Sequence, residues 1–213
     1  MNPIHPGEEP GTDQFVKLDL LECETVLEEI NPALKGSHFH PATVTILAQN
    51  PVFYPGYRFF DIADYETTPH IRKFVLYKPG HVVVLNWTNT PLYALNETAP
   101  LYLDDRTVLE YVRFFFTYIR GRHGRFIITD SVEDVMWRDE PPPAARKAIG
   151  QMLEPLHIAE RTVEGGYRLV ARMMFKDSLF KTIVNVKADG MINLSDEELL
   201  IEEMPVLDDT FGQ

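Results

Sequence analysis

Cationic side chains are concentrated in one short stretch of this sequence. Arg120, Arg122, His123 and Arg125 lie within six residues, together with two glycines. Guanidinium groups bind phosphate and carboxylate groups through paired hydrogen bonds, so this stretch is a candidate anion-binding site. Histidine titrates near neutral pH, which would allow His123 to transfer a proton in an enzyme built on this stretch.

The same stretch follows a predicted helix, and this gives its charges a structural interpretation. The C-terminal end of a helix carries partial negative charge, which favours cations of the chain and repels an incoming anion. We therefore favour a structural role for the four cations and keep anion binding as the alternative. A further hypothesis is that residues 195–213, which hold seven carboxylates and no Lys or Arg, fold back over the arginines and neutralise them.

A pair of histidines is the next candidate. In His38-Phe39-His40 the two imidazoles lie on one side of any extended segment. A metal ion needs a third and preferably a fourth ligand, and the sequence identifies neither. We therefore predict no metal site and no cofactor.

Motifs for nucleophilic catalysis and nucleotide binding are absent from the sequence. It has no Gly-x-Ser-x-Gly elbow, no phosphate-binding glycine loop and no His-Glu-x-x-His pair. Cys23, the only cysteine, lies between Glu22 and Glu24, whose charges disfavour a thiolate. The sequence does not decide whether the chain is an enzyme.

Aromatic residues cluster around Pro55-Gly56. Large rings beside a turn can anchor a protein partner, although packing in the core is the more common role for most such rings. If any of these rings are exposed, we expect Tyr54 and Tyr57 to be the ones that bind a partner.

Composition excludes several classes of function. The net charge of −12 disfavours binding to nucleic acid and to anionic membranes. The hydrophobic fraction of 45% predicts a folded globule, and no segment reads as an export signal or a membrane span. A single cysteine favours a cytoplasmic location.

A helix over Val108–Arg120 is the clearest element that would position the cations. Apolar residues recur along it at helical spacing, Thr107 and Glu110 fit a capping box, and Gly121 fits a left-handed stop. Its aromatic face predicts packing on a β-sheet.

Strands account for most of the remaining pattern. Tyr167–Phe175 alternates apolar and polar residues, and Asp189-Gly190 predicts a tight hairpin between Leu179–Lys187 and Met191–Leu194, which together form a meander. Further strands are predicted at Phe15–Leu20, Thr43–Ala48, Tyr57–Ile62, His81–Trp87 (buried on both faces) and Phe126–Thr129, and further helices at Glu24–Ile30 and after Pro143.

These elements predict an α+β fold, with a mostly antiparallel sheet, a C-terminal meander and two to three helices packed on one face. Residues 1–14 are expected to form a flexible leader, residues 15–194 a single domain and residues 195–213 an acidic C-terminal segment. The function predicted by elimination is non-enzymatic binding of a protein partner or self-association. The alternative is a small-molecule site for an anionic ligand, possibly enzymatic, that uses the Arg/His stretch.

Overall fold

The computed structural model describes residues 15–121 and 124–207 of the 213-residue chain. Within these ranges it contains four α-helices and two antiparallel sheets, which confirms the predicted α+β class. No helix among the described residues is long and apolar enough to span a membrane. The chain forms two compact units, Met1–Asn86 and Trp87–Gln213, and each is described by itself. The single domain expected over residues 15–194 stays a prediction.

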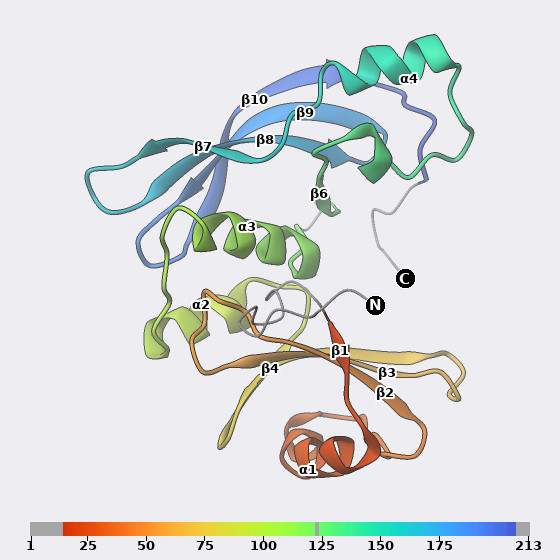
Figure 1. Cartoon of the computed structure of the whole chain (residues 1–213), viewed down its shortest axis with the longest axis vertical. Helices are drawn as coiled ribbons and strands as arrows, with labels where there is room; N and C mark the ends of the chain where they lie inside the picture. The colour runs from red at the N-terminus through yellow and green to blue at the C-terminus, as the bar shows by residue number, and fades with distance from the viewer. Residues whose placement is uncertain (1–14, 122–123, 208–213) are drawn as a thin grey trace, which may run out of the picture. The chain divides into compact units, whose positions relative to one another are not determined.

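The first unit is a five-stranded antiparallel sheet with one helix on a face of it (Figure 1). The strands follow one another in sequence order across the sheet: β1 (Val16–Lys17), β2 (Val44–Gln49), β3 (Arg58–Asp64), β4 (Ile71–Lys78) and β5 (His81–Leu85). Helix α1 (Leu20–Ile30) continues into a short 3₁₀ turn, Asn31–Ala33. Val26 and Ile30 of α1 pack on Ile46 and Ile62 of the sheet in one hydrophobic core.

Helix α1 begins at a capping box. The Asp19 carboxylate accepts a 2.8 Å hydrogen bond from the Glu22 amide, and the Glu22 carboxylate accepts a 3.1 Å bond from the Asp19 amide. Cys23 lies one residue further, buried and unbridged. Burial, followed by the charges of Glu22 and Asp19, raises the pKa of the Cys23 thiol, the direction that the sequence predicts.

Two strands of this unit differ from the prediction. β4 was not predicted, because Arg72, Lys73 and Lys78 interrupt its apolar pattern. β5 was predicted to be buried on both faces, which is wrong: it is an edge strand in which only Leu85 is buried. Because β5 pairs with β4 alone, its other hydrogen-bonding edge has no neighbouring strand in this sheet.

The second unit has its own antiparallel sheet, in the order β10-β9-β8-β6, with β7 also paired to β8. Its strands are β6 (Phe126–Ile128), β7 (His157–Arg161), β8 (Tyr167–Phe175), β9 (Ser178–Val186) and β10 (Ile192–Ile201). β8, β9 and β10 form the predicted meander. β10 continues past residue 194, so the first part of the expected acidic segment is a paired strand.

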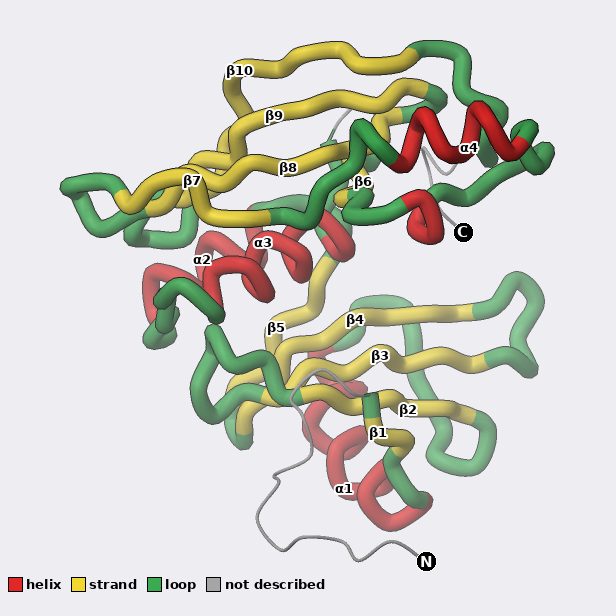
Figure 2. Tube along the Cα trace, turned by 45° about the horizontal axis from the view of Figure 1, so that its top comes forward, coloured by secondary structure: helices red, strands yellow, loops and turns green. Residues whose placement is uncertain are grey.

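The second unit also contains three helices: α2 (Thr90–Thr98), α3 (Thr107–Tyr118) and α4 (Pro143–Gly150). α3 lies along one face of the sheet, and α4 lies on the opposite face toward one end (Figures 1 and 2). Leu169, Ala171 and Met173 of β8 are fully buried, whereas the intervening Arg168 and Val170 are partly exposed, as the alternation predicts. On the other face, α4 contributes to a smaller core with residues of β8 and β9.

Both ends of α3 differ from the prediction. The Asp104 carboxylate accepts hydrogen bonds from the amides of Arg106 (2.9 Å) and Thr107 (2.8 Å), so the Thr107–Glu110 capping box is wrong. The helix ends at Tyr118, and Gly121 is not in the left-handed region. The chain leaves the helix early because the Arg120 amide bonds to the Trp87 carbonyl at 2.8 Å.

The β9–β10 hairpin has a longer loop than the two-residue turn that Asp189-Gly190 suggests. Lys187 and Met191 are joined by a backbone hydrogen bond, and only Gly190 has positive φ (79°) in the loop between them. This is the three-residue hairpin with a glycine bulge. The Tyr93 hydroxyl of α2 bonds to both the amide and the carbonyl of Ile192 directly after this loop.

Candidate functional site

Arg120 makes a structural contact. Its guanidinium lies over the Trp87 ring, 3.6 Å from the ring centroid, and its amide bonds to the Trp87 carbonyl. A guanidinium stacked on an aromatic face is held by cation–π attraction. Arg122 and His123 lie outside the described residues, so anion binding by the Arg/His stretch stays the alternative prediction.

Arg125 lines a small hollow of about 190 Å³ with Arg113, a residue outside the predicted cluster. Arg113 forms a 2.5 Å ion pair with Asp130, and the other carboxylate oxygen of Asp130 accepts a 2.8 Å hydrogen bond from the Leu156 amide. The charge of Arg113 is therefore matched by a carboxylate of its own unit, which weakens this hollow as an anion site.

The acidic C-terminal segment pairs with other cations in its described part. Asp196 lies 3.4 Å from Arg168, and Glu198 lies 3.9 Å from Lys181. These partners belong to β8 and β9 of the same sheet, in which β9 lies between β8 and β10. Asp208 and Asp209 lie outside the described residues, so their predicted contact with the Arg/His stretch stays a prediction.

Tyr54 and Tyr57 are buried, with 0% and 5% of their surfaces exposed, so neither is an exposed ring in this structure and the core role favoured for most of the cluster applies to both. The Tyr54 amide bonds to the Pro51 carbonyl, and the Tyr57 amide bonds to the Tyr54 carbonyl. These turns bring the two rings together at 6.0 Å, and the Tyr57 hydroxyl reaches His81 Nδ1 at 2.7 Å. Burial also raises the pKa of Tyr57. Neither side chain offers a surface to a partner.

His38 and His40 line an open hollow of about 520 Å³ in the first unit, which we call the helix–loop hollow. Its lining comes from α1, the 3₁₀ turn and the loop that follows: Glu24, Leu27, Glu28, Asn31, Pro32, His38, Phe39, His40 and Pro41. Phe39 is buried in the core, whereas His38 and His40 are exposed, as expected for an extended segment. No group of three His, Cys, Asp or Glu side chains in the described part of the chain is placed to hold a metal ion.

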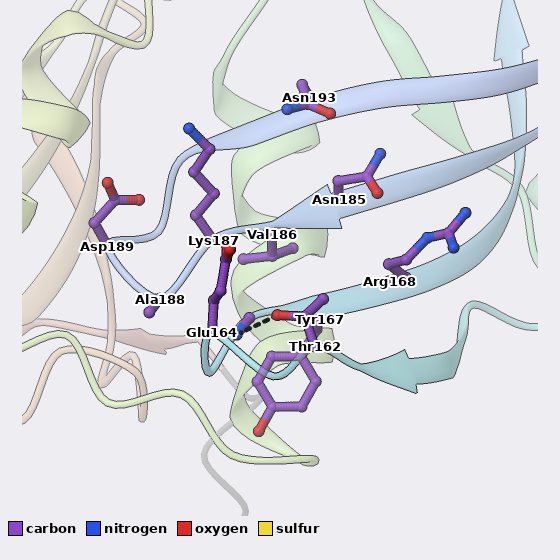
Figure 3. A pocket seen from close by; sticks show the side chains of 11 residues that line it. Thr162, Glu164, Tyr167, Arg168, Asn185, Val186, Lys187, Ala188, Asp189 and Asn193 are labelled. Atoms are coloured by element: carbon purple, nitrogen blue, oxygen red, sulfur yellow. Dashed lines mark hydrogen bonds between the residues drawn. The ribbon is translucent and has the colours of Figure 1, made fainter.

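A hollow of about 560 Å³ in the second unit lies at the ends of two hairpins (Figure 3). We call it the hairpin hollow. Its lining comes from β7–β8 and β9–β10 with their loops: Thr162, Glu164, Gly166, Tyr167, Arg168, Asn185, Val186, Lys187, Ala188, Asp189 and Asn193. The sequence analysis did not identify these residues as a site.

Three polar residues of the hairpin hollow are aligned across adjacent strands. Arg168 of β8 is paired with Asn185 of β9, and Asn185 is paired with Asn193 of β10. The Asn185 amide nitrogen donates to the Ser195 hydroxyl at 2.9 Å. Arg168 lies 3.4 Å from both Glu160 and Asp196. In-register residues of neighbouring strands project to the same face of a sheet, so the row is continuous.

The backbone around the hairpin hollow is fixed by its own side chains. The Thr162 hydroxyl accepts a 2.9 Å hydrogen bond from the Gly166 amide (dashed in Figure 3), and the Asp189 carboxylate accepts one of 2.9 Å from the Met191 amide. A Cβ atom at Gly166 would collide with the Val186 carbonyl, so glycine permits the two hairpins to approach closely here. The hollow is therefore formed before any ligand arrives.

Other polar groups of the hairpin hollow face solvent. The side chains of Glu164, Lys187 and Asn193 are exposed, and none has a hydrogen-bond or ion-pair partner among the described residues. Figure 3 shows Asn193 and Asn185 on neighbouring strands and Glu164 on the loop before β8. These groups are available to a polar ligand.

Comparisons of this chain with protein-family models, with curated proteins and with solved structures find no match. The two larger hollows are therefore the basis for assigning a function.

Proposed function

We propose that this chain is a non-enzymatic binding protein that holds an extended, polar segment of a protein partner in the hairpin hollow. The observation that carries the proposal is the in-register row of Arg168, Asn185 and Asn193. A side-chain amide offers both a donor and an acceptor, as a peptide group does. Adjacent strands lie about 4.8 Å apart, so the row covers about 10 Å, the length of about three residues of extended chain.

The charges beside this row favour a partner segment with charged side chains. Lys187 and Glu164 line the same hollow and have no ion-pair partner among the described residues. An acidic and a basic side chain of the partner would each find an opposite charge, which favours one orientation of the bound segment. The preformed backbone also lowers the ordering cost of binding, because the hairpin loops need not rearrange.

A cytoplasmic location is part of this proposal. Cys23 is buried and unbridged, which suits a compartment that keeps thiols reduced. A second copy of the chain is one form that the partner can take, and sedimentation of the purified chain distinguishes self-association from binding to another protein.

A small anionic ligand is the second candidate. Lys187 lines the hairpin hollow without an ion-pair partner among the described residues, and Arg168 lines it too but shares its charge with Glu160 and Asp196. This pair, with Lys187 as the main cation, takes the place of the Arg/His stretch as the basis for anion binding. A free carboxylate or phosphate would contact both cations without the length of a peptide.

The test is selection of a displayed library of random peptides on the immobilised full chain. We expect selected peptides to bind a chain carrying N185A and N193A at least about tenfold more weakly, because the row then loses its amide contacts. A K187A chain is the second variant, and K181A is its matched control, because Lys181 also belongs to this sheet but lies outside the hollow.

Peptides that bind the wild type, the N185A/N193A chain and the two lysine variants equally would contradict the proposal. If no peptide is selected, titration with inorganic phosphate and acetate followed by NMR tests the second candidate. Shifts at Arg168 and Lys187 with either anion would favour an anion site over a peptide site.

A further inference from the structure

One wall of the helix–loop hollow in the first unit carries two acidic side chains on one face of α1. Glu24 and Glu28 are four residues apart on α1, so their Cβ atoms are about 6 Å apart on neighbouring turns. Both side chains are exposed, and neither has an ion-pair or hydrogen-bond partner among the described residues. Two like charges at this spacing repel each other, and a cation bound between them would relieve that repulsion.

The facing wall is a loop held in place by Asn31. The Asn31 amide nitrogen donates to the Phe39 carbonyl at 2.9 Å, and its oxygen accepts from the Phe39 amide at 2.9 Å. These bonds fix the extended segment beside the end of α1, while the Phe39 ring is buried in the core. His38 and His40 therefore stand on the solvent side, where both line the hollow.

The imidazole rings add flat faces to the hollow. His40 Nδ1 accepts a 3.2 Å hydrogen bond from the Ala42 amide, which restrains the ring. A guanidinium group stacks on such planar faces while its nitrogen atoms bond to carboxylates, a combination that a compact ammonium group cannot match.

The rest of the lining is apolar. Leu27, Pro32 and Pro41 line the hollow together with the glutamates and the histidines. Apolar surface of this kind receives the aliphatic stem of a long cationic side chain, whose charged end stays near the acidic rim.

We propose that the helix–loop hollow binds the side chain of an arginine presented by another molecule. Glu24 and Glu28 accept hydrogen bonds from the guanidinium, His38 and His40 stack against its plane, and the apolar lining contacts its stem. This site lies in the first unit and does not depend on the hairpin hollow, so either proposal can fail alone.

The test uses N-acetyl-arginine amide as the probe and N-acetyl-citrulline amide as its neutral isostere. We expect the arginine probe, added to the ¹⁵N-labelled full chain, to shift the amide signals of residues 24–41, and the citrulline probe to leave them unchanged. The E24Q/E28Q double variant should weaken binding about tenfold, since each exposed ion pair contributes modestly. Added salt should weaken binding to the wild type.

The matched control is the E97Q/E202Q double variant, which removes the same charge from two exposed glutamates of the second unit. It should bind the arginine probe as the wild type does. Preserved amide spectra of both variants would show that folding is unchanged. Equal binding of citrulline, equal weakening in the control, or no shift at residues 24–41 would overturn the proposal.

Discussion

The hydroxyl group of Tyr111 donates a hydrogen bond of 2.7 Å to the backbone carbonyl of Gly190. It also accepts one of 3.0 Å from the Asn96 amide nitrogen, and the Tyr111 side chain is fully buried. Helix α3 is thereby attached to the loop of the β9–β10 hairpin, which forms one wall of the hairpin hollow. The shape of that wall depends on a helix far away in the sequence.

Removing this hydroxyl should destabilise the protein. In Y111F the Gly190 carbonyl and the Asn96 amide lose a buried partner, and we expect the free energy of unfolding to fall by about 1–3 kcal/mol. Urea denaturation followed by circular dichroism measures the change. Y65F is the control, because Tyr65 is 61% exposed, and its effect should stay within about 0.5 kcal/mol. Equal effects of the two variants would contradict a structural role for the Tyr111 hydroxyl.

Replacing Gly190 with alanine should lower the stability of the protein more than replacing Gly80 with alanine. Both residues have positive φ (79° and 77°), so alanine introduces similar backbone strain of about 1–2 kcal/mol at either position. At Gly190 the new methyl group would also collide with Leu101 and Asn96, whereas nothing lies within 4 Å at Gly80. We expect G190A to be less stable than G80A by at least about 1 kcal/mol, because overpacking adds to the strain. Thermal unfolding of the two variants makes the comparison, and equal melting temperatures would contradict it.

The stability of the protein should depend on pH through Asp104 at the N-terminus of α3. Hydrogen bonds from the backbone, that of Thr107 foremost, lower the pKa of Asp104 below its ordinary value of 3.8. A carboxylate whose pKa is lowered by folding adds stability above the unfolded pKa, and this stability is lost as pH falls through the folded pKa. D104N should therefore be less stable than the wild type at about pH 6, and the difference should shrink at about pH 2.5. Melting temperatures at the two pH values measure the effect, and a constant difference would exclude a contribution from ionisation.

The ion pair of Asp61 and Arg72 should contribute more to the stability of the protein than an exposed ion pair does. The Asp61 side chain is 8% exposed, and both of its oxygens accept hydrogen bonds from the Arg72 guanidinium. D61N should cost about 1–3 kcal/mol, because the charge-assisted bonds are lost at a buried position. D139N is the control, since Asp139 is 75% exposed in its pair with Arg138 and should change stability by less than about 0.5 kcal/mol. Equal losses in urea denaturation would show that burial of Asp61 is unimportant.

The fold was predicted best where one short pattern determines the local structure. The alternation in Tyr167–Phe175 gave both the bounds of β8 and its buried face. The prediction was wrong at both ends of α3, where residues outside the helix determine the structure. Thr107 resembles a cap, but the Asp104 carboxylate takes that role, and α3 ends early because Arg120 pairs with Trp87. Such pairings leave no periodic signal in the sequence.

The candidate sites were less predictable than the fold. His38 and His40 were recognisable because their alternation with Phe39 places both imidazoles on one side. Their acidic counterparts, Glu24 and Glu28, become visible only once α1 and the loop are placed together. The hairpin hollow gave no local signal, since its row of polar residues comes from three strands and depends on strand register.

The concealed position of Cys23 makes the chain convenient for spectroscopy. Its thiol is buried and its pKa is raised, so we expect alkylating reagents not to react with it while the protein is folded. A cysteine introduced on each unit would then accept a fluorophore or spin label without removal of the native thiol. Distance measurements between such labels would test whether the label-to-label distance changes when peptide or arginine is added.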